Sequence, residues 1–379
     1  MSAKEKADFQ PFLMERMMSK WENVVDYNLS ESGVHPISVE ELVEDPAVIK
    51  QLLRTPLGYP QGNGIIDLRE NIAALYPGAT PENVLVTVGG AEANFVTIQT
   101  LVAPGEEMVM MLPNYMQIWG VAKNFGITVK EFHLREERGW APDLNELEEV
   151  VSDNTKLIAV CNPDNPTGYI LTEGEMEAIV AVADKVGAWL LSDEVYTGAE
   201  RLTDTQTPSF WGRYDKALSM NSLSKAYGLP GLRIGWVAGP ADTVDGIAAR
   251  HQYVTIGATM LSNHLAAIAL SPEVRPRLIQ RARDYVRRGY PILDSWLESH
   301  EGLFRVVPPQ AAAIAYARYN MDINSTELVQ RLIDEKSVFI VPGDQFGMDY
   351  YLRISHGLPE DYLKGGLDRF GELIEELQG

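Results

Sequence analysis

The sequence holds a single cysteine, Cys161, among 379 residues. One thiol cannot build a disulfide framework, so we expect a reducing compartment, by default the cytoplasm. No apolar run reaches the roughly 18 residues that a membrane-spanning helix needs. The opening residues, MSAKEKADFQPF, also lack the apolar stretch of a secretory signal.

Basic residues are also few. Lysine and arginine number 32 against 53 aspartate and glutamate residues, which gives a formal net charge of -21. Such a charge repels the phosphates of nucleic acids, so we expect no nucleic-acid partner and no fused DNA-binding regulator. The six histidines show no HExxH or comparable ligand spacing, so we expect no metal site.

From about residue 65 the chain alternates between strand and helix patterns. Seven short apolar runs, such as NVLVTVGG (83–90) and KLIAVCN (156–162), are separated mostly by helical patterns such as AEANFVTIQTLV (91–102). This alternation predicts an α/β fold whose large domain has a mostly parallel, seven-stranded sheet flanked by helices.

The pattern changes after about residue 275, where a long charged helix precedes shorter elements. We expect a second, smaller α/β domain there, since 379 residues are enough for two domains. The predicted division is an N-terminal segment with part of the small domain over 1–45, a large domain over 46–270 and the C-terminal small domain over 271–379.

Glycines and polar residues gather where the predicted strands end. In open α/β sheets, ligands bind outside the carboxyl ends of the strands. One predicted site therefore draws on five places in the chain: Gly89 and Gly90, residues 113–115, residues 162–168, residues 193–196 and residues 222–225.

The segment NSLSKAYGLPGLRIGW (221–236) suggests the chemistry of that site. Ser222 and Ser224 precede Lys225, and Arg233 follows after a glycine-containing turn. A lone lysine at a strand end is usually a solvated charge. Two hydroxyls and a guanidinium beside the amine instead suggest a bound phosphate and a Schiff base to pyridoxal 5'-phosphate.

Other residues meet the further needs of such a cofactor. In TVGGAEAN (87–94) a strand ends in two glycines and a helix follows, whose N-terminus suits a phosphate, although a simple turn is the alternative. Asp193 can pair with the pyridine nitrogen, or cap a helix. Asn165 and Tyr196 can hydrogen-bond the ring hydroxyl, and Tyr115 can stack on the ring or pack in the core.

These motifs together resemble the class I/II aminotransferase superfamily, the fold-type I pyridoxal-phosphate enzymes. The resemblance spans about residues 28 to 357 and rests on NPDNPTG (162–168), SDEVY (192–196), SLSKAYGLPGLRIGW (222–236), VPGDQFG (341–347) and LRISHG (352–357). It implies a homodimer with shared active sites.

The resemblance also implies a role for each matching residue. Lys225 is the Schiff-base lysine and general acid/base, with Asp193 and Tyr115 completing the catalytic set. Arg353 binds the α-carboxylate of the substrate, and Asn165, Gly33 and His35 lie near it. The implied cofactor ligands are Gly90, Ala91, Glu92, Tyr115, Asn165, Asp193, Tyr196, Ser222, Ser224, Lys225, Arg233 and, from the neighbouring subunit, Tyr59.

The reaction implied is transamination of a free L-α-amino acid with an oxo acid, through an external aldimine and a quinonoid. A second reading comes from the loop NLSESGVHPIS (28–38), which resembles that of capreomycidine synthase and related cyclases or lyases acting on hydroxylated arginine. His35 would then act as an acid or base, and Glu22 and Glu31 would face a cationic side chain. Alternatively, the loop only covers the substrate, and His35 is a packing or hydrogen-bonding residue without a chemical role.

Overall fold

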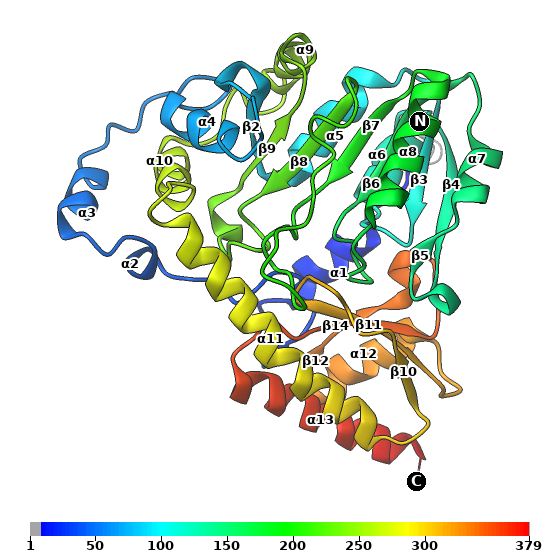
Figure 1. The fold of residues 1–379 in the computed structure, drawn as a ribbon. Helices are drawn as coiled ribbons and strands as arrows, with labels where there is room; N and C mark the ends of the chain where they lie inside the picture. The colour runs from blue at the N-terminus through cyan, green and yellow to red at the C-terminus, as the bar shows by residue number, and fades with distance from the viewer. Residues whose placement is uncertain (1–8, 379) are drawn as a thin grey trace, which may run out of the picture.

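The computed structural model describes residues 9–378, and its central feature is an eight-stranded sheet (Figure 1). The strand order is β2-β9-β8-β7-β6-β3-β4-β5. Most of its residues are buried, which explains the continuous apolar runs. The strands are β2 (Val84–Val88), β3 (Glu107–Leu112), β4 (Thr128–Arg135), β5 (Ala141–Pro142), β6 (Thr155–Cys161), β7 (Trp189–Asp193), β8 (Ala217–Ser222) and β9 (Ile234–Ala238).

The strand directions confirm the prediction of a mostly parallel sheet. Strands β4, β3, β6, β7 and β8 run parallel, whereas β9 is antiparallel to both β8 and β2. The predicted count of seven was one too low, because β5 adds a two-residue antiparallel pair to the end of β4. Two residues are too few to leave a periodic pattern in the sequence.

Helices pack on this sheet, and four of them, α5 to α8, connect its strands (Figure 1). They are α4 (Ile66–Ala73), α5 (Gly89–Leu101), α6 (Gln117–Asn124), α7 (Leu144–Val150), α8 (Glu173–Val186), α9 (Ala241–His251) and α10 (Met260–Ala269). The capping box of Thr172 and Glu175 starts α8, and Gly187 ends it in the left-handed conformation. Gly89 and Gly90 open α5 instead of ending the preceding strand, as the sequence pattern had suggested.

A smaller antiparallel sheet of order β10-β11-β14-β13 lies below the large one in Figure 1. Its strands are β10 (Phe304–Val306), β11 (Ile314–Tyr319), β13 (Val341–Pro342) and β14 (Tyr351–Ser355). The helices α11 (Arg275–Ser299), α12 (Ser325–Lys336) and α13 (Glu360–Gln378) accompany it, and α11 spans both regions. This confirms a second, smaller α/β region.

The N-terminal segment joins the C-terminal part of the chain. Strand β1 (Tyr27–Asn28) pairs in parallel with β12 (Val338–Phe339). Before it, α1 (Leu13–Trp21) lies between the two sheets in Figure 1, and α2 (Val39–Leu42) and α3 (Pro46–Leu52) follow. The exact domain boundaries given above stay a prediction, and residues 1–8 lie outside the described part.

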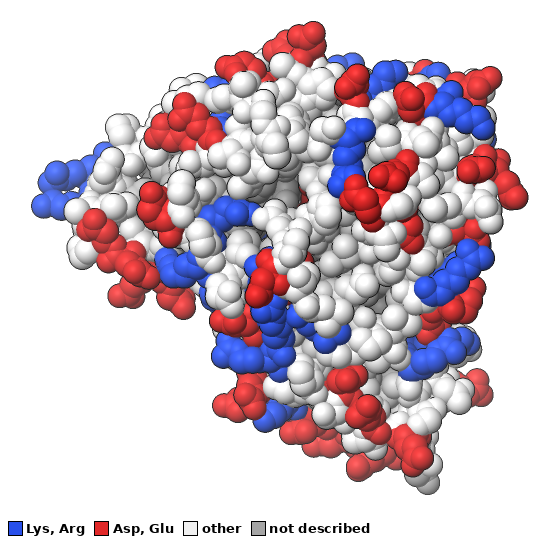
Figure 2. Space-filling model, viewed as in Figure 1, with Lys and Arg blue, Asp and Glu red and all other residues white. Residues whose placement is uncertain are grey.

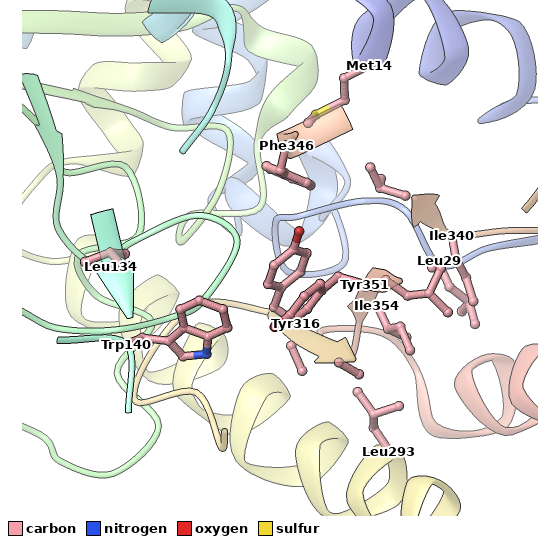
Figure 3. Packing of buried hydrophobic residues seen from close by; sticks show 14 of the residues in the cluster. Met14, Leu29, Leu134, Trp140, Leu293, Tyr316, Ile340, Phe346, Tyr351 and Ile354 are labelled. Atoms are coloured by element: carbon pink, nitrogen blue, oxygen red, sulfur yellow. The ribbon is translucent and has the colours of Figure 1, made fainter. Parts of the chain in front are cut away.

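A continuous apolar core connects α1 and the two sheets. Figure 3 shows Met14 of α1 near Phe346, with Tyr316 and Tyr351 beside them. The rings of Tyr316 and Tyr351 stack with centroids 4.8 Å apart, and Trp140 lies 5.9 Å from Tyr316. This packing fixes the N-terminal helix over the junction of the sheets.

The surface agrees with the acidic composition. Figure 2 shows Lys and Arg side chains along α11 with Asp and Glu side chains around them. Among the described residues, no helix combines the length and apolarity needed to cross a membrane, and no group of His, Cys, Asp and Glu is arranged to hold a metal ion.

Candidate active site

Lys225 lies three residues beyond β8, at the carboxyl end of the large sheet. The N-terminal loop packs on this turn: a Cβ on Gly33 would lie 2.8 Å from the Ser224 carbonyl oxygen, and the Val34 N–H donates to the Lys225 carbonyl at 3.2 Å. The Ser224 N–H donates to Ser222 Oγ at 3.3 Å. Since the Lys225 side chain is still 26% exposed, its amine remains open to a ligand.

The N-terminus of α5 forms an anion site next to this turn. Because α5 begins at Gly89, the N–H groups of Gly89, Gly90 and Ala91 have no acceptor within the helix. A Cβ on Gly90 would lie 3.7 Å from the Ser222 Cβ, so the serine adjoins the helix end. The Arg233 guanidinium occupies the space where a Gly89 side chain would lie. Backbone donors, a hydroxyl and a guanidinium together suit a phosphate.

Asp193 ends β7 and is only 4% exposed. Burial raises the pKa of its carboxyl to about 7, although the Val195 N–H, the Asn94 side chain and the Lys225 charge oppose the rise. The Val195 N–H is 3.2 Å from Asp193 Oδ1. A buried carboxylate in this state gains stability from a cation or from a shared proton.

Tyr115 and Tyr196 lie close to this carboxylate. The charges of Asp193 and Tyr196 act on the Tyr115 hydroxyl and help to raise the pKa of Tyr115, after burial and the neighbouring Glu15. Burial also raises the pKa of Tyr196, with the Arg353 charge opposing it. These electrostatic effects show that the three side chains lie near one another, and their shared role stays a prediction.

Arg353 occupies β14 of the smaller sheet and is 2% exposed. Its Nη2 donates to the Ser30 carbonyl at 2.7 Å, and its Nη1 donates to Asn165 Oδ1 at 3.1 Å. Its buried Nε–H has no hydrogen-bond partner among residues 9–378. Two hydrogen bonds hold the Nη atoms of this guanidinium in place, and its unpaired Nε–H can donate to a carboxylate.

Three glutamates from the N-terminal segment adjoin the site. Glu31 Oε1 lies 3.4 Å from Lys225 Nζ, and the Tyr115 hydroxyl donates to Glu15 Oε1 at 2.7 Å. Burial would raise the pKa of Glu31, but Lys225 and a backbone N–H outweigh it and lower that pKa. The pKa of Glu22 is raised by burial and then by the charges of Glu31 and Glu15. The carboxyl groups of Glu15 and Glu31 therefore lie close enough to Glu22 to act on it electrostatically.

The structure of the single chain leaves two of the predicted residues outside this group. The Tyr59 side chain is 88% exposed on the loop between α3 and α4. The His35 ring is exposed and lies 6.2 Å from the ring of Tyr285 on α11. Burial lowers the pKa of His35, the Arg281 charge adds to this, and Glu41 opposes it. The roles of Tyr59 and His35 stay predictions.

Sequence reasoning missed several residues of the site. Glu15 was not singled out in the N-terminal segment, and Asn94 was placed only in the predicted helix AEANFVTIQTLV (91–102). Ser32, whose side chain hydrogen-bonds Tyr196, was passed over within the N-terminal loop. A carboxylate on a short helix upstream of a glycine-containing loop carries no distinctive local pattern, so only the fold brings these residues together.

The comparison with known families agrees with this geometry. The family model described as aminotransferase class I and II matches residues 33–370. The chain belongs to this family. Members of the aminotransferase class I and II family use pyridoxal 5'-phosphate, so this protein is a pyridoxal-phosphate-dependent enzyme.

Individual relatives of this aminotransferase-family chain differ in activity. It is 34% identical to capreomycidine synthase of Streptomyces vinaceus over 91% of this chain and 89% of that one. It is 27% identical to the aspartate/prephenate aminotransferase of Thermus thermophilus over 93% and 94%. A pyridoxal-phosphate-dependent aminotransferase structure from Streptococcus suis matches with a TM-score of 0.91 and 30% identity, over 98% of this chain and 99% of that one.

The residues of this family member fit the cofactor. Burial leaves Asp193 with a carboxyl whose raised pKa favours a shared proton, which a pyridine nitrogen can supply. The free N–H groups at the start of α5, with Ser222 and Arg233, match a phosphate dianion. The amine of Lys225 lies on the same sheet edge as both groups.

Proposed function

We propose that this enzyme is an aminotransferase that acts on a free L-α-amino acid and an oxo acid. The observation that carries the proposal is the placement of Lys225, Asp193 and the start of α5 at one edge of the large sheet. Arg353 of the smaller sheet lies close enough to Tyr196 for its charge to oppose the rise that burial causes in the pKa of the Tyr196 hydroxyl. The orphaned Nε–H of Arg353 supplies a donor for the α-carboxylate.

Each of these residues has a distinct role in the proposal. Pyridoxal phosphate, when bound, supplies an electron sink for the negative charge that develops at the α-carbon of an amino acid. Arg353 and Asn165 hold the α-carboxylate, and Lys225 Nζ takes and returns the α-proton as general acid/base. Asp193 keeps a proton on the ring nitrogen, while Tyr115 and Tyr196 orient the ring.

We propose the remaining cofactor contacts on the same basis. The N–H groups of Gly90, Ala91 and Glu92, the hydroxyls of Ser222 and Ser224, and the Arg233 guanidinium bind the phosphate. Tyr59 reaches the phosphate of a second copy in a homodimer. In the single chain, large apolar side chains are exposed at Tyr59, Leu53, Leu57 and Tyr253. This exposure supports a surface that a second copy of the chain would cover. A cytoplasmic location stays a prediction.

A panel of amino acids tests the proposed function. The purified enzyme with pyridoxal phosphate is mixed with each amino acid, with and without 2-oxoglutarate or pyruvate, while cofactor absorbance and products are followed. We expect turnover that requires the oxo acid. Turnover without any oxo acid would replace transamination by another reaction at the same site.

A second candidate is cyclisation or elimination on a hydroxylated arginine, as in the relative named capreomycidine synthase. The cluster of Glu15, Glu22 and Glu31 favours it, because carboxylates near the reacting amine complement a guanidinium. The predicted acid or base, His35, would assist the side-chain chemistry. The same panel decides, since 3-hydroxyarginine would then be consumed with no oxo acid present.

The Asp193→Asn variant should still bind pyridoxal phosphate but turn over slowly. A neutral amide does not favour the protonated ring nitrogen, and one lost hydrogen bond between charged groups is worth about 1.5–3 kcal/mol, or about 10- to 150-fold in rate. Exchange of the substrate α-proton in deuterated water measures this step. Exchange at the wild-type rate would show that Asp193 has another role.

The Glu22→Gln variant tests whether Glu22 faces a cationic side chain of the substrate. We expect the apparent Kd of L-arginine to rise by about two- to fivefold, as for a partly exposed charge pair, while that of L-methionine stays constant. Glu40→Gln, on the exposed face of α2, is the matched control and should change neither value. An equal change for both amino acids would rule out a charge contact to the substrate.

A further inference from the structure

Behind the proposed phosphate site lies a buried contact between Glu92 and His251. Glu92 is in the first turn of α5 and 7% exposed, and His251 is the last residue of α9 and fully buried. Glu92 Oε1 lies 3.0 Å from His251 Nδ1 and accepts the Thr255 hydroxyl at 2.7 Å. Glu92 Oε2 accepts the Val88 N–H at 2.6 Å. The carboxylate thus has donors on both oxygens.

The other ring nitrogen of His251 determines its protonation. Nε2 lies 3.0 Å from the Gly62 carbonyl oxygen, which can only accept a hydrogen bond. Nε2 must therefore carry a proton. Nδ1 faces a carboxylate that already receives two other hydrogen bonds, and a proton on Nδ1 would complete these contacts. The contacts describe an imidazolium, and its position at the C-terminus of α9 favours a positive charge.

This pair has a consequence for an anion at the start of α5. An unpaired carboxylate in the first helical turn would repel a phosphate bound to the N–H groups of Gly90 and Ala91. We propose that the His251 imidazolium neutralises Glu92 and thereby makes His251 a positioning residue for the cofactor phosphate. The inference rests on the proposed phosphate site.

The same contact ties the phosphate site to the loop that carries Tyr59. His251 Nε2 holds the Gly62 carbonyl, and a Cβ on Gly257 would lie 3.3 Å from Gly62 Cα. These contacts therefore connect the start of α5, the end of α9 and the loop at Gly62.

A double-mutant cycle with His251→Gln and Glu92→Gln tests the inference through cofactor affinity. The dissociation constants of pyridoxal phosphate and of phosphate-free pyridoxal are measured by equilibrium dialysis for the wild type, both single variants and the double variant. We expect His251→Gln to weaken pyridoxal phosphate by about tenfold or more, and the double variant to recover to within about threefold of the wild type. Pyridoxal should bind all four proteins alike.

Arg250→Gln is the matched control, because it removes an exposed positive charge one residue away on the same helix. It should leave both dissociation constants unchanged. Equal pyridoxal phosphate affinity in the wild type and in His251→Gln, or equal losses for both ligands, would overturn the inference. A wild type that binds no pyridoxal phosphate would instead refute the proposed function itself.

The nitrogen-15 spectrum of histidine-labelled protein provides a second test that needs no His251 variant. Only six histidines contribute signals, and the Glu92→Gln variant identifies His251. We expect both ring nitrogens of His251 to be protonated in the wild type at pH 8, and one in Glu92→Gln. A neutral His251 ring in the wild type at that pH would overturn the ion pair even if His251→Gln did not fold.

Discussion

Replacing Lys225 with alanine should abolish turnover and remove the absorbance band of covalently attached cofactor, while the protein keeps its thermal unfolding midpoint within a few degrees. The reason is chemical, because in the proposed function Lys225 supplies both the amine that attaches the cofactor and the base for the α-proton. The side chain is partly exposed and, among residues 9–378, its single close polar contact is Glu31 at 3.4 Å, so its loss leaves no buried cavity.

Lys216→Ala is the matched control for this variant. Lys216 directly precedes β8, at the opposite end of the strand from Lys225, and its Nζ donates to the Gly187 carbonyl at 2.8 Å. It should keep full activity and the full absorbance band. Retained turnover in Lys225→Ala would show that another amine carries the cofactor.

Replacing Arg353 with lysine should lower kcat/KM for every amino acid substrate by roughly 10- to 150-fold. The ammonium group cannot present two parallel donors to the α-carboxylate, and one charge-assisted hydrogen bond is worth about 1.5–3 kcal/mol. Because the α-carboxylate is common to all amino acids, the loss should be uniform across the panel. Steady-state kinetics with several substrates measures it.

Arg318→Lys is the matched control for Arg353. Arg318 lies on the neighbouring strand β11 but is exposed. Its replacement should change kcat/KM by less than about twofold, as for most exposed positions. A loss confined to one amino acid in Arg353→Lys would place Arg353 at a side chain of the substrate instead of its carboxylate.

The sequence was most informative where strands end. Lys225 and Asp193 could be placed on one sheet edge because buried parallel strands leave recognisable apolar runs, and ligands gather at their carboxyl ends. The direction of β9 could not be read, since an apolar run looks the same in a parallel and an antiparallel strand. Short elements such as α2 and β5 have too few residues for periodicity.

Contacts between distant segments were beyond the sequence. Glu92 and His251 are 159 residues apart and carry no motif, and Glu15 meets Tyr115 from 100 residues away. Glu92 was matched to the phosphate site through its backbone, whereas its side chain points to His251. The role of Tyr59 depends on a second copy of the chain, which one sequence does not describe.

The most direct test of the central claim is to locate the cofactor on the chain. The enzyme loaded with pyridoxal phosphate is reduced with borohydride, digested and mapped by mass spectrometry. The account predicts a phosphopyridoxyl group on the peptide that contains Lys225 and on no other lysine. A modified lysine elsewhere, with an unmodified Lys225 in active enzyme, would contradict it.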